Sequence, residues 1–100
     1  MIDFIVVAGP NTCKTGYVWR EADETDWVCV TAATRKEVAD DNAATASRWV
    51  NGAYGPKTCI NGYVWRGAFP KDYACVVKAR RTAAAQDNAQ AESRLLQKLA

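Results

Sequence analysis

Apolar and polar side chains alternate in two short stretches near the start of the chain. Residues 16–22 and 27–31 are rich in aromatic and β-branched side chains, and the polar segment 23–26 lies between them. Strands that are half-buried in a sheet show this alternation, because successive side chains point to opposite faces. The pattern predicts a β-hairpin, and it returns from residue 62 onward.

A four-residue turn would fix the register of this hairpin. Ala22 would then lie opposite Trp27, and Arg20 would lie opposite Cys29. In that register the Arg20 guanidinium could lie beside the Trp27 ring. The equivalent pair in the later hairpin is Arg66 and Tyr73.

The pattern changes to a helical period after each hairpin. Thr31 or Thr34 can cap the first helix, and Thr34-Arg-Lys-Glu37 has the spacing of a capping box. Small apolar side chains recur at helical spacing up to about Val50, and Asn51-Gly52 predicts the end of the helix. The second helix is expected to begin near Ala79 and to reach the C-terminus. Its apolar side would be extended by Leu95, Leu96 and Leu99.

The chain contains an internal repeat with an offset of 46 positions. Residues 9–48 and 55–94 align without gaps and agree at 21 of 40 positions. Each copy begins Gly-Pro-x-Thr-Cys-x-x-Gly-Tyr-Val-Trp-Arg-x-Ala. Two copies are too few for a solenoid, so we expect a compact pair with pseudo-twofold symmetry. The sequence thus predicts an α+β fold of two tandem ββα repeats, at residues 9–54 and 55–100, preceded by an N-terminal strand at residues 1–8.

Four cysteines stand at matching places in the two copies. Cys13 and Cys29 are 16 positions apart, as are Cys59 and Cys75, and the chain has no histidine and no C-x-x-C pair. A structural zinc site usually takes two ligands from one tight turn, so this spacing favours disulfides. One bridge within each repeat is the simplest pairing, and a pairing between repeats stays open. Each bridge would stabilise the fold by about 3 kcal/mol.

The repeat resembles a family of predicted secreted bacterial proteins that contain single or tandem G-P-x-T-C-x-x-G-[FY]-V-W-R-x-A units. In that family the motif is followed by a cysteine-valine step and an alanine-rich helix with an asparagine, as at Cys29-Val30 and Asn42 here. The resemblance covers residues 9–94. It implies export, but it implies no activity, because members of the family mostly have no assigned function.

The cysteines also predict where the protein works. Stable disulfides are typical of oxidising compartments, so we expect a secreted or cell-envelope protein. Residues 1–8 lack the basic start of a secretory signal, so a signal peptide is not expected in this chain. No apolar run approaches the roughly 18 residues that cross a bilayer, so we expect no membrane span.

The two repeats differ in charge. Residues 9–48 contain five basic and seven acidic side chains, a net charge of −2, whereas residues 55–94 contain seven and three, a net charge of +4. Opposite charges favour contact between the repeats, within one molecule or head to tail between two. A total of +2 without alternating basic and aromatic side chains does not indicate nucleic-acid binding.

Side chains that usually carry catalysis are scarce. The chain has no histidine and its cysteines are expected in disulfides, so neither a base nor a nucleophile stands out. Asp23, Glu24 and Asp26 crowd one hairpin tip, but the second repeat has Phe69 and Pro70 at the matching places. A solvated turn explains this cluster, and weak calcium binding stays open. We predict a protein without catalytic residues, resident metal or cofactor.

Residues that both repeats share are expected to have structural roles. Arg20 and Arg66 are expected to stack on aromatic rings, and Asn42 and Asn88 are expected to bond a neighbouring loop. Exposed aromatic side chains, and a lysine in the loop 68–72, are better candidates for binding. The candidate binding residues are Trp27, Tyr54, Phe69, Lys71 and Tyr73.

Three functions fit these residues. The first is an extracellular binding module for an envelope glycan or a protein partner. The second is an inhibitor or toxin-like effector whose loop 68–72 inserts into the cleft of a target. The third is a structural assembly module that pairs copies of the chain through residues 2–8, or through the edge formed by Leu95, Leu96 and Leu99.

Overall fold

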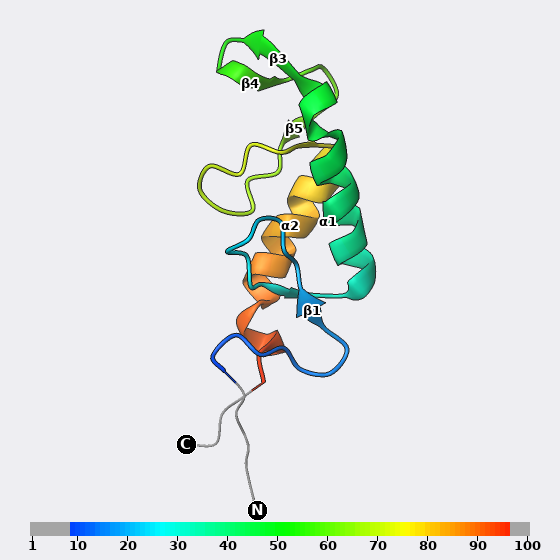
Figure 1. Ribbon diagram of the computed structural model, residues 1–100, viewed down its shortest axis with the longest axis vertical. Coiled ribbons are helices and arrows are strands. Elements are labelled where there is room, and N and C mark those ends of the chain that lie inside the picture. The colour runs from blue at the N-terminus through cyan, green and yellow to red at the C-terminus, as the bar shows by residue number, and fades with distance from the viewer. Residues whose placement is uncertain (1–8, 97–100) are drawn as a thin grey trace, which may run out of the picture.

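Residues 9–96 are described by the computed structural model, whose helices and short antiparallel hairpins confirm the predicted α+β class (Figure 1). In chain order the elements are β1 (Val18–Trp19), β2 (Cys29–Val30), α1 (Ala32–Ala44), the 3-10 helix η1 (Thr45–Arg48), β3 (Trp49–Gly52), β4 (Gly55–Cys59), β5 (Val64–Trp65), β6 (Cys75–Val76), α2 (Lys78–Gln90) and the 3-10 helix η2 (Glu92–Arg94). The strands form three two-stranded ladders, β1 with β2, β3 with β4 and β5 with β6. The predicted strand at 1–8 and Leu99 lie outside the described residues.

The first hairpin has a different register from the predicted one. Trp19 lies opposite Cys29, so the prediction that Arg20 would face Cys29 is wrong by one residue. The cause is the connection, which is a wide loop over residues 20–28 rather than a four-residue turn. Glu21 bends this loop with a φ of 56°, in the left-handed region. β5 and β6 pair in the same way, with Trp65 opposite Cys75.

A buried ion pair organises each of the two hairpin loops. Arg20 donates from Nε and Nη2 to the Asp26 carboxylate at 2.6 and 3.1 Å, and both side chains are almost fully buried. Arg66 and Asp72 form the same pair at 2.8 and 3.0 Å. Each carboxylate also accepts a backbone N–H from its own loop. The Arg20 guanidinium is therefore bound to a carboxylate. The predicted stacking of Arg20 and Arg66 on aromatic rings is not observed, because the cations that lie over rings within residues 9–96 are Arg48, Lys57 and Arg94.

Both helices end earlier than the sequence pattern predicts. α1 ends at Ala44 rather than near Val50, and after η1 the chain is extended from Trp49. α2 ends at Gln90, and the chain is extended at Leu95. The expectation that Leu95 and Leu96 extend the apolar side of a helix is therefore wrong.

The segment after each helix packs on the other half of the chain, which explains these early ends. Arg48 donates from Nη1 to the Cys75 carbonyl at 2.9 Å, and its guanidinium lies 4.5 Å from the centre of the Tyr63 ring. Arg94 donates likewise to the Cys29 carbonyl at 3.0 Å. A longer helix would carry each arginine away from its carbonyl, because a helical backbone shortens and rotates the segment.

The segments that follow α1 and α2 also form backbone pairings. Trp49 of β3 pairs with Cys59 of β4, and this hairpin, which the sequence pattern did not predict, forms one end of the molecule (Figure 1). At the opposite end Leu95 forms an antiparallel bridge with Cys13. At both ends of the molecule, the segment that follows a helix therefore pairs with the segment that contains the first cysteine of a disulfide.

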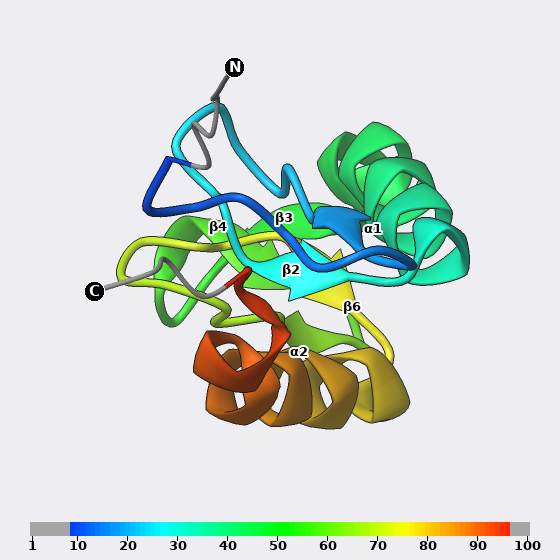
Figure 2. The ribbon, with the colours of Figure 1, turned by 90° about the horizontal axis from the view of Figure 1, so that it is seen from below.

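The core is small and contains both disulfides. Cys13 is bonded to Cys29, and Cys59 is bonded to Cys75. Val30 and Val76 follow the second cysteine of each bridge and are fully buried. α1 and α2 run in opposite directions and flank β2 and β6 (Figures 1 and 2). Because a chain of this size buries little apolar surface, the two bridges, at about 3 kcal/mol each, are a large part of its stability.

The described helices and acidic side chains do not build a membrane span or a metal centre. Within residues 9–96 no helix combines the length and the apolar character needed to cross a bilayer. The same part of the chain holds no group of three or more His, Cys, Asp or Glu side chains that could bind a metal ion together.

Candidate functional site

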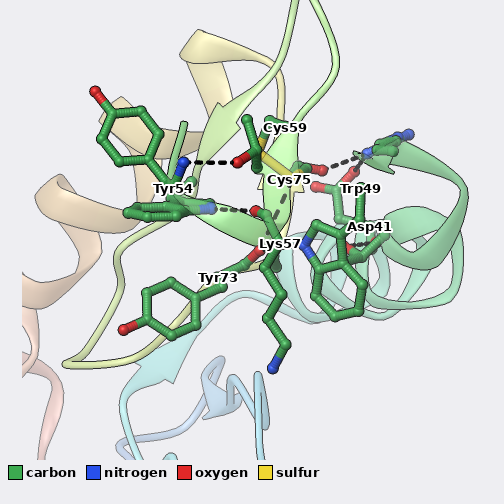
Figure 3. The surroundings of a disulfide bond; sticks show 12 residues. Asp41, Trp49, Tyr54, Lys57, Cys59, Tyr73 and Cys75 are labelled. Atoms are coloured by element: carbon green, nitrogen blue, oxygen red, sulfur yellow. Dashed lines mark hydrogen bonds and ion pairs between the residues drawn. A yellow bond between two sulfur atoms is a disulfide. The ribbon is translucent and has the colours of Figure 1, made fainter. Parts of the chain in front are cut away.

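A row of aromatic rings runs along the end of the molecule that contains β3 and β4. The Tyr54 and Trp65 rings meet edge to face with centres 5.5 Å apart, and the Trp65 and Tyr73 rings follow at 4.7 Å. The Lys57 ammonium then lies between Tyr73 and Trp49, at 5.7 and 5.1 Å from the two ring centres (Figure 3). We call Tyr54, Trp65, Tyr73 and Trp49 the aromatic strip.

Hydrogen bonds to the backbone hold the two tryptophans of the aromatic strip in place. Trp65 Nε1 donates to the Lys57 carbonyl at 2.8 Å, and Trp49 Nε1 donates to the Tyr73 carbonyl at 2.9 Å. The Tyr54 N–H donates to the Thr58 hydroxyl at 3.0 Å, which fixes the turn between β3 and β4. Because the indole N–H groups are satisfied by protein, the rings present rigid apolar faces.

A groove of about 430 Å³ lies against one side of the aromatic strip. Tyr54, Tyr63 and Trp65 supply its apolar walls, and Thr58 and Arg81 supply polar groups. A pocket of this size, with apolar walls and a few polar groups, is typical of small-ligand sites. We call it the aromatic groove.

The cation in the aromatic groove differs from its counterpart earlier in the chain. Arg35 stands 46 positions before Arg81 and forms an ion pair with Glu21 at 3.4 Å. The residue that matches Glu21 is Gly67, so the second loop cannot supply that carboxylate. Among residues 9–96, no carboxylate lies within 4.0 Å of the Arg81 guanidinium. Arg81 can therefore offer its charge to the groove.

A second cavity of about 280 Å³ lies between the two hairpin loops, beside the other two rings of the aromatic strip. Phe69 and Lys71 of loop 66–74 line it together with Tyr73 and Trp49 of the strip. Asp23 of loop 20–28 lines it from the opposite side. We call it the interloop cleft. The two loops that form it lie on one side of the helix pair (Figure 1).

The first hairpin carries only a short aromatic pair. Trp19 and Trp27 meet edge to face at 4.5 Å. Trp27 lines a separate cleft of about 290 Å³, in which Leu95 and Asn11 occupy the places that match Trp49 and Lys57. The row of rings is therefore extended at one end of the molecule only.

The structure brings four of the five predicted binding residues to one surface. Tyr54 is 74% exposed and Tyr73 is half-buried, and both belong to the aromatic strip. Phe69 and Lys71 line the adjacent interloop cleft. Trp27, at 42% exposure, lies on the first hairpin, away from these four.

The predicted structural residues lie in the frame behind these surfaces. Asn42 donates to the Ala22 carbonyl at 2.9 Å, and Asn88 donates to the Ala68 carbonyl at 2.8 Å. Each asparagine thus joins a helix to a hairpin loop. Together with the two buried arginine–aspartate pairs, these bonds fix the loops that line the interloop cleft.

The loop 68–72 is shaped more as a cavity wall than as a projecting arm. Ala68 and Asp72 are buried, Phe69 is half-buried, and only Pro70 and Lys71 are exposed. An inserted inhibitor loop needs an exposed anchor side chain, and Phe69 faces the interloop cleft instead.

The predicted binding residues did not include Trp49, Lys57, Trp65 or Arg81, although the sequence favours an exposed Trp49 and a basic patch in the second repeat that contains Lys57 and Arg81. Trp49 was expected in a helix that ends at Asn51-Gly52, whereas Gly52 lies in a β-strand. The clue was the segment 49–58, in which two glycines flank a short turn between residues of strand type, a hairpin pattern. Trp65 belongs to the Tyr-Val-Trp triplet that both repeats share, which the sequence favours as core, but the structure leaves this residue only half-buried.

Comparison with known proteins gave no match to a protein-family model, a curated protein or a solved structure.

Proposed function

We propose that this chain is a secreted or cell-envelope module that binds polysaccharide without catalysing a reaction, and that the aromatic strip is its binding surface. The observation that carries the proposal is the unbroken contact from Tyr54 through Trp65 to Tyr73. Rings in a row can stack on successive units of a chain-like ligand, because each pyranose has an apolar C–H face. A row of this kind suits an extended glycan better than a compact metabolite.

The architecture supports this use because it makes the surface rigid. We propose that residues 9–54 and 55–100 are copies of one module with pseudo-twofold symmetry, one disulfide in each. The matching bonds of Arg48 and Arg94 to Cys75 and Cys29 support this relation. A pre-organised surface loses less conformational entropy when a ligand binds.

Two further features support export and the absence of catalysis. The two disulfides support export, because disulfides persist in oxidising compartments. The chain has no histidine, and no free cysteine is found among the described residues. The two carboxylates that line the interloop cleft beside the strip are engaged by other groups, Asp72 by the Arg66 guanidinium and Asp23 by Thr25. The other polar neighbours of the strip are tyrosine, threonine, lysine and arginine side chains, which bind and orient ligands.

The test is affinity electrophoresis of the purified protein in gels that contain a soluble glucan, a chitooligosaccharide polymer or polygalacturonate. We expect at least one polysaccharide to retard the protein. Tyr54→Ala should then weaken binding about fivefold or more, because tyrosines are enriched among the few contact residues whose truncation costs over about 1 kcal/mol. Tyr54 is 74% exposed in a turn, so the fold should tolerate the change.

The matched control is Trp27→Ala, which removes an exposed ring from the first hairpin. Under the proposal it leaves the retardation unchanged. Failure of all three polysaccharides to retard the protein would overturn the proposal. Loss of binding with Trp27→Ala but not with Tyr54→Ala would place the surface on the first hairpin and would also overturn it.

A further inference from the structure

The interloop cleft combines aromatic walls with two lysines. Trp49, Phe69 and Tyr73 form its walls, and Lys57 and Lys71 also line it. At the matching places in the first hairpin stand Asn11 and Thr25, so the cleft near Trp27 has neither cation. The positive charge is therefore a special feature of this cleft and not of the repeat.

The Lys57 ammonium lies beside two aromatic rings of the cleft. Its Nζ lies 5.1 Å from the Trp49 ring centre and 5.7 Å from the Tyr73 ring centre. Lys57 is exposed, so these contacts stabilise the position of its ammonium only modestly and leave it open to a negative charge. In Figure 3 the Lys57 side chain extends between these two rings.

Lys71 occupies a backbone position that glycine would fill with less strain. It follows Pro70 in a turn closed by the Asp72 N–H and the Phe69 carbonyl at 3.0 Å, and its φ is 68°. A turn of this form prefers glycine at the residue after proline. A lysine there costs about 1 kcal/mol or more. Strain of this kind is commonly kept where the side chain has a function.

The carboxylates around the cleft leave an excess of positive charge. Asp72 is bound by the buried Arg66 guanidinium and is neutralised by it. Asp23 lines the cleft from the other loop and accepts hydrogen bonds from the Thr25 N–H and hydroxyl, both at 2.8 Å. Of the two carboxylates that line the cleft, Asp72 has a cationic partner and Asp23 has none among the described residues. One unneutralised carboxylate therefore stands against two lysines, so the cleft attracts an anion.

We infer that the interloop cleft binds the acidic group of a polysaccharide whose neighbouring units lie on the aromatic strip. The inference rests on the proposed function, and it names the ligand class as an acidic glycan. The carboxylate of a uronic acid and the phosphate of a phosphorylated sugar share the required chemistry, a negative charge on a pyranose. Either group could accept hydrogen bonds from both ammonium groups.

The experiment is isothermal titration calorimetry of the intact protein with three probes: an oligogalacturonide, the same oligosaccharide as its methyl ester, and a phosphorylated mannan. The inference predicts that at least one anionic probe binds about tenfold more tightly than the neutral ester. Lys57→Met and Lys71→Gly should each weaken that binding about five- to tenfold, as expected for a charged hydrogen bond. Asp23→Asn should strengthen it, because it removes the opposing charge.

Lys78→Met is the matched control, because it removes one positive charge from the exposed start of α2, outside the cleft. It should change the affinity by less than twofold. Lys71→Gly should also raise the midpoint of urea unfolding, which shows that its lower affinity does not come from a damaged fold. Binding of the oligogalacturonide by its carboxylates, or of the mannan by its phosphates, each supports the inference and identifies the source of the charge.

Two outcomes separate this inference from the proposed function. Equal affinity for the oligogalacturonide and its methyl ester, with binding still lost in Tyr54→Ala, would overturn the acidic subsite and leave the polysaccharide-binding strip standing. Equal losses in Lys57→Met, Lys71→Gly and Lys78→Met would also overturn the subsite, because they would show attraction to the net charge alone.

Discussion

The ion pair between Arg66 and Asp72 should be indispensable to the fold, and Asp72→Asn tests this. The two side chains are 3% and 4% exposed, and the Asp72 carboxylate accepts from Arg66 Nε and Nη2 at 2.8 and 3.0 Å. It also accepts the Ala68 N–H at 2.9 Å. Arg66 Nη1 is buried and has no hydrogen-bond partner among the described residues. The guanidinium therefore depends on this single carboxylate.

Removing the charge of Asp72 leaves a buried guanidinium without compensation. Breaking a buried pair in this way typically costs about 3–5 kcal/mol. In a domain of this size that loss corresponds to a fall of roughly 12 °C or more in the melting temperature. Urea unfolding followed by tryptophan fluorescence measures the free-energy change directly.

Asp40→Asn is the control, because Asp40 forms an ion pair with Lys36 one helical turn away while both side chains are largely exposed. This change should cost about 0.5 kcal/mol or less. The double variant Arg66→Met with Asp72→Asn should be more stable than Asp72→Asn alone, since it removes the uncompensated charge. A loss below about 1 kcal/mol in Asp72→Asn, or strict additivity in the double variant, would refute the reasoning.

Three other changes test the packing of the fold and its relation to the binding surface. Gly52→Ala would place a Cβ 2.7 Å from Thr58 Cγ2, so it should destabilise the protein by about 1–3 kcal/mol and weaken glycan binding in gels, whereas Gly9→Ala should do neither. Arg94→Met should lower the free energy of unfolding in urea by about 1.5–3 kcal/mol, because the Cys29 carbonyl loses a charged donor. A change below about 0.5 kcal/mol would contradict a stabilising role for the bond between Arg94 and this carbonyl. Replacing Cys59 and Cys75 by serine should cost about 3 kcal/mol and reduce polysaccharide binding, while the same change at Cys13 and Cys29 should cost a similar amount with little effect on binding at low temperature; equal binding losses would contradict the location of the site.

The local pattern of the sequence was enough to predict the α+β class and the start of the first helix. Alternating residues and a capping threonine act within a few positions, so Thr31 caps α1 and the hairpins form beside it as expected. The predicted register was wrong because the connection is not the four-residue turn that the polar segment suggested; it is a loop held together by the bond between Arg20 and Asp26.

The helix ends and the aromatic strip could not be predicted, because their partners are distant in the chain. Trp49 lies in β3, after the first helix, where it pairs with Cys59 and donates from Nε1 to the Tyr73 carbonyl. Leu95 likewise pairs with Cys13, which lies at the other end of the sequence. Hydrophobic spacing does not show where a helix ends, and here each helix ends where the following residues contact the other half of the chain. The strip joins residues from both halves, so no single segment of sequence contains it.

The most direct test of the proposed surface is the NMR spectrum of the indole N–H groups, because the chain has only four tryptophans. Trp49 and Trp65 belong to the aromatic strip, whereas Trp19 and Trp27 form the separate pair on the first hairpin. On titration with whichever of the oligogalacturonide and the phosphorylated mannan binds in calorimetry, we expect the signals of Trp49 and Trp65 to shift and those of Trp19 and Trp27 to stay in place. Shifts confined to Trp19 and Trp27, or four unchanged signals at a concentration that saturates binding, would contradict the account.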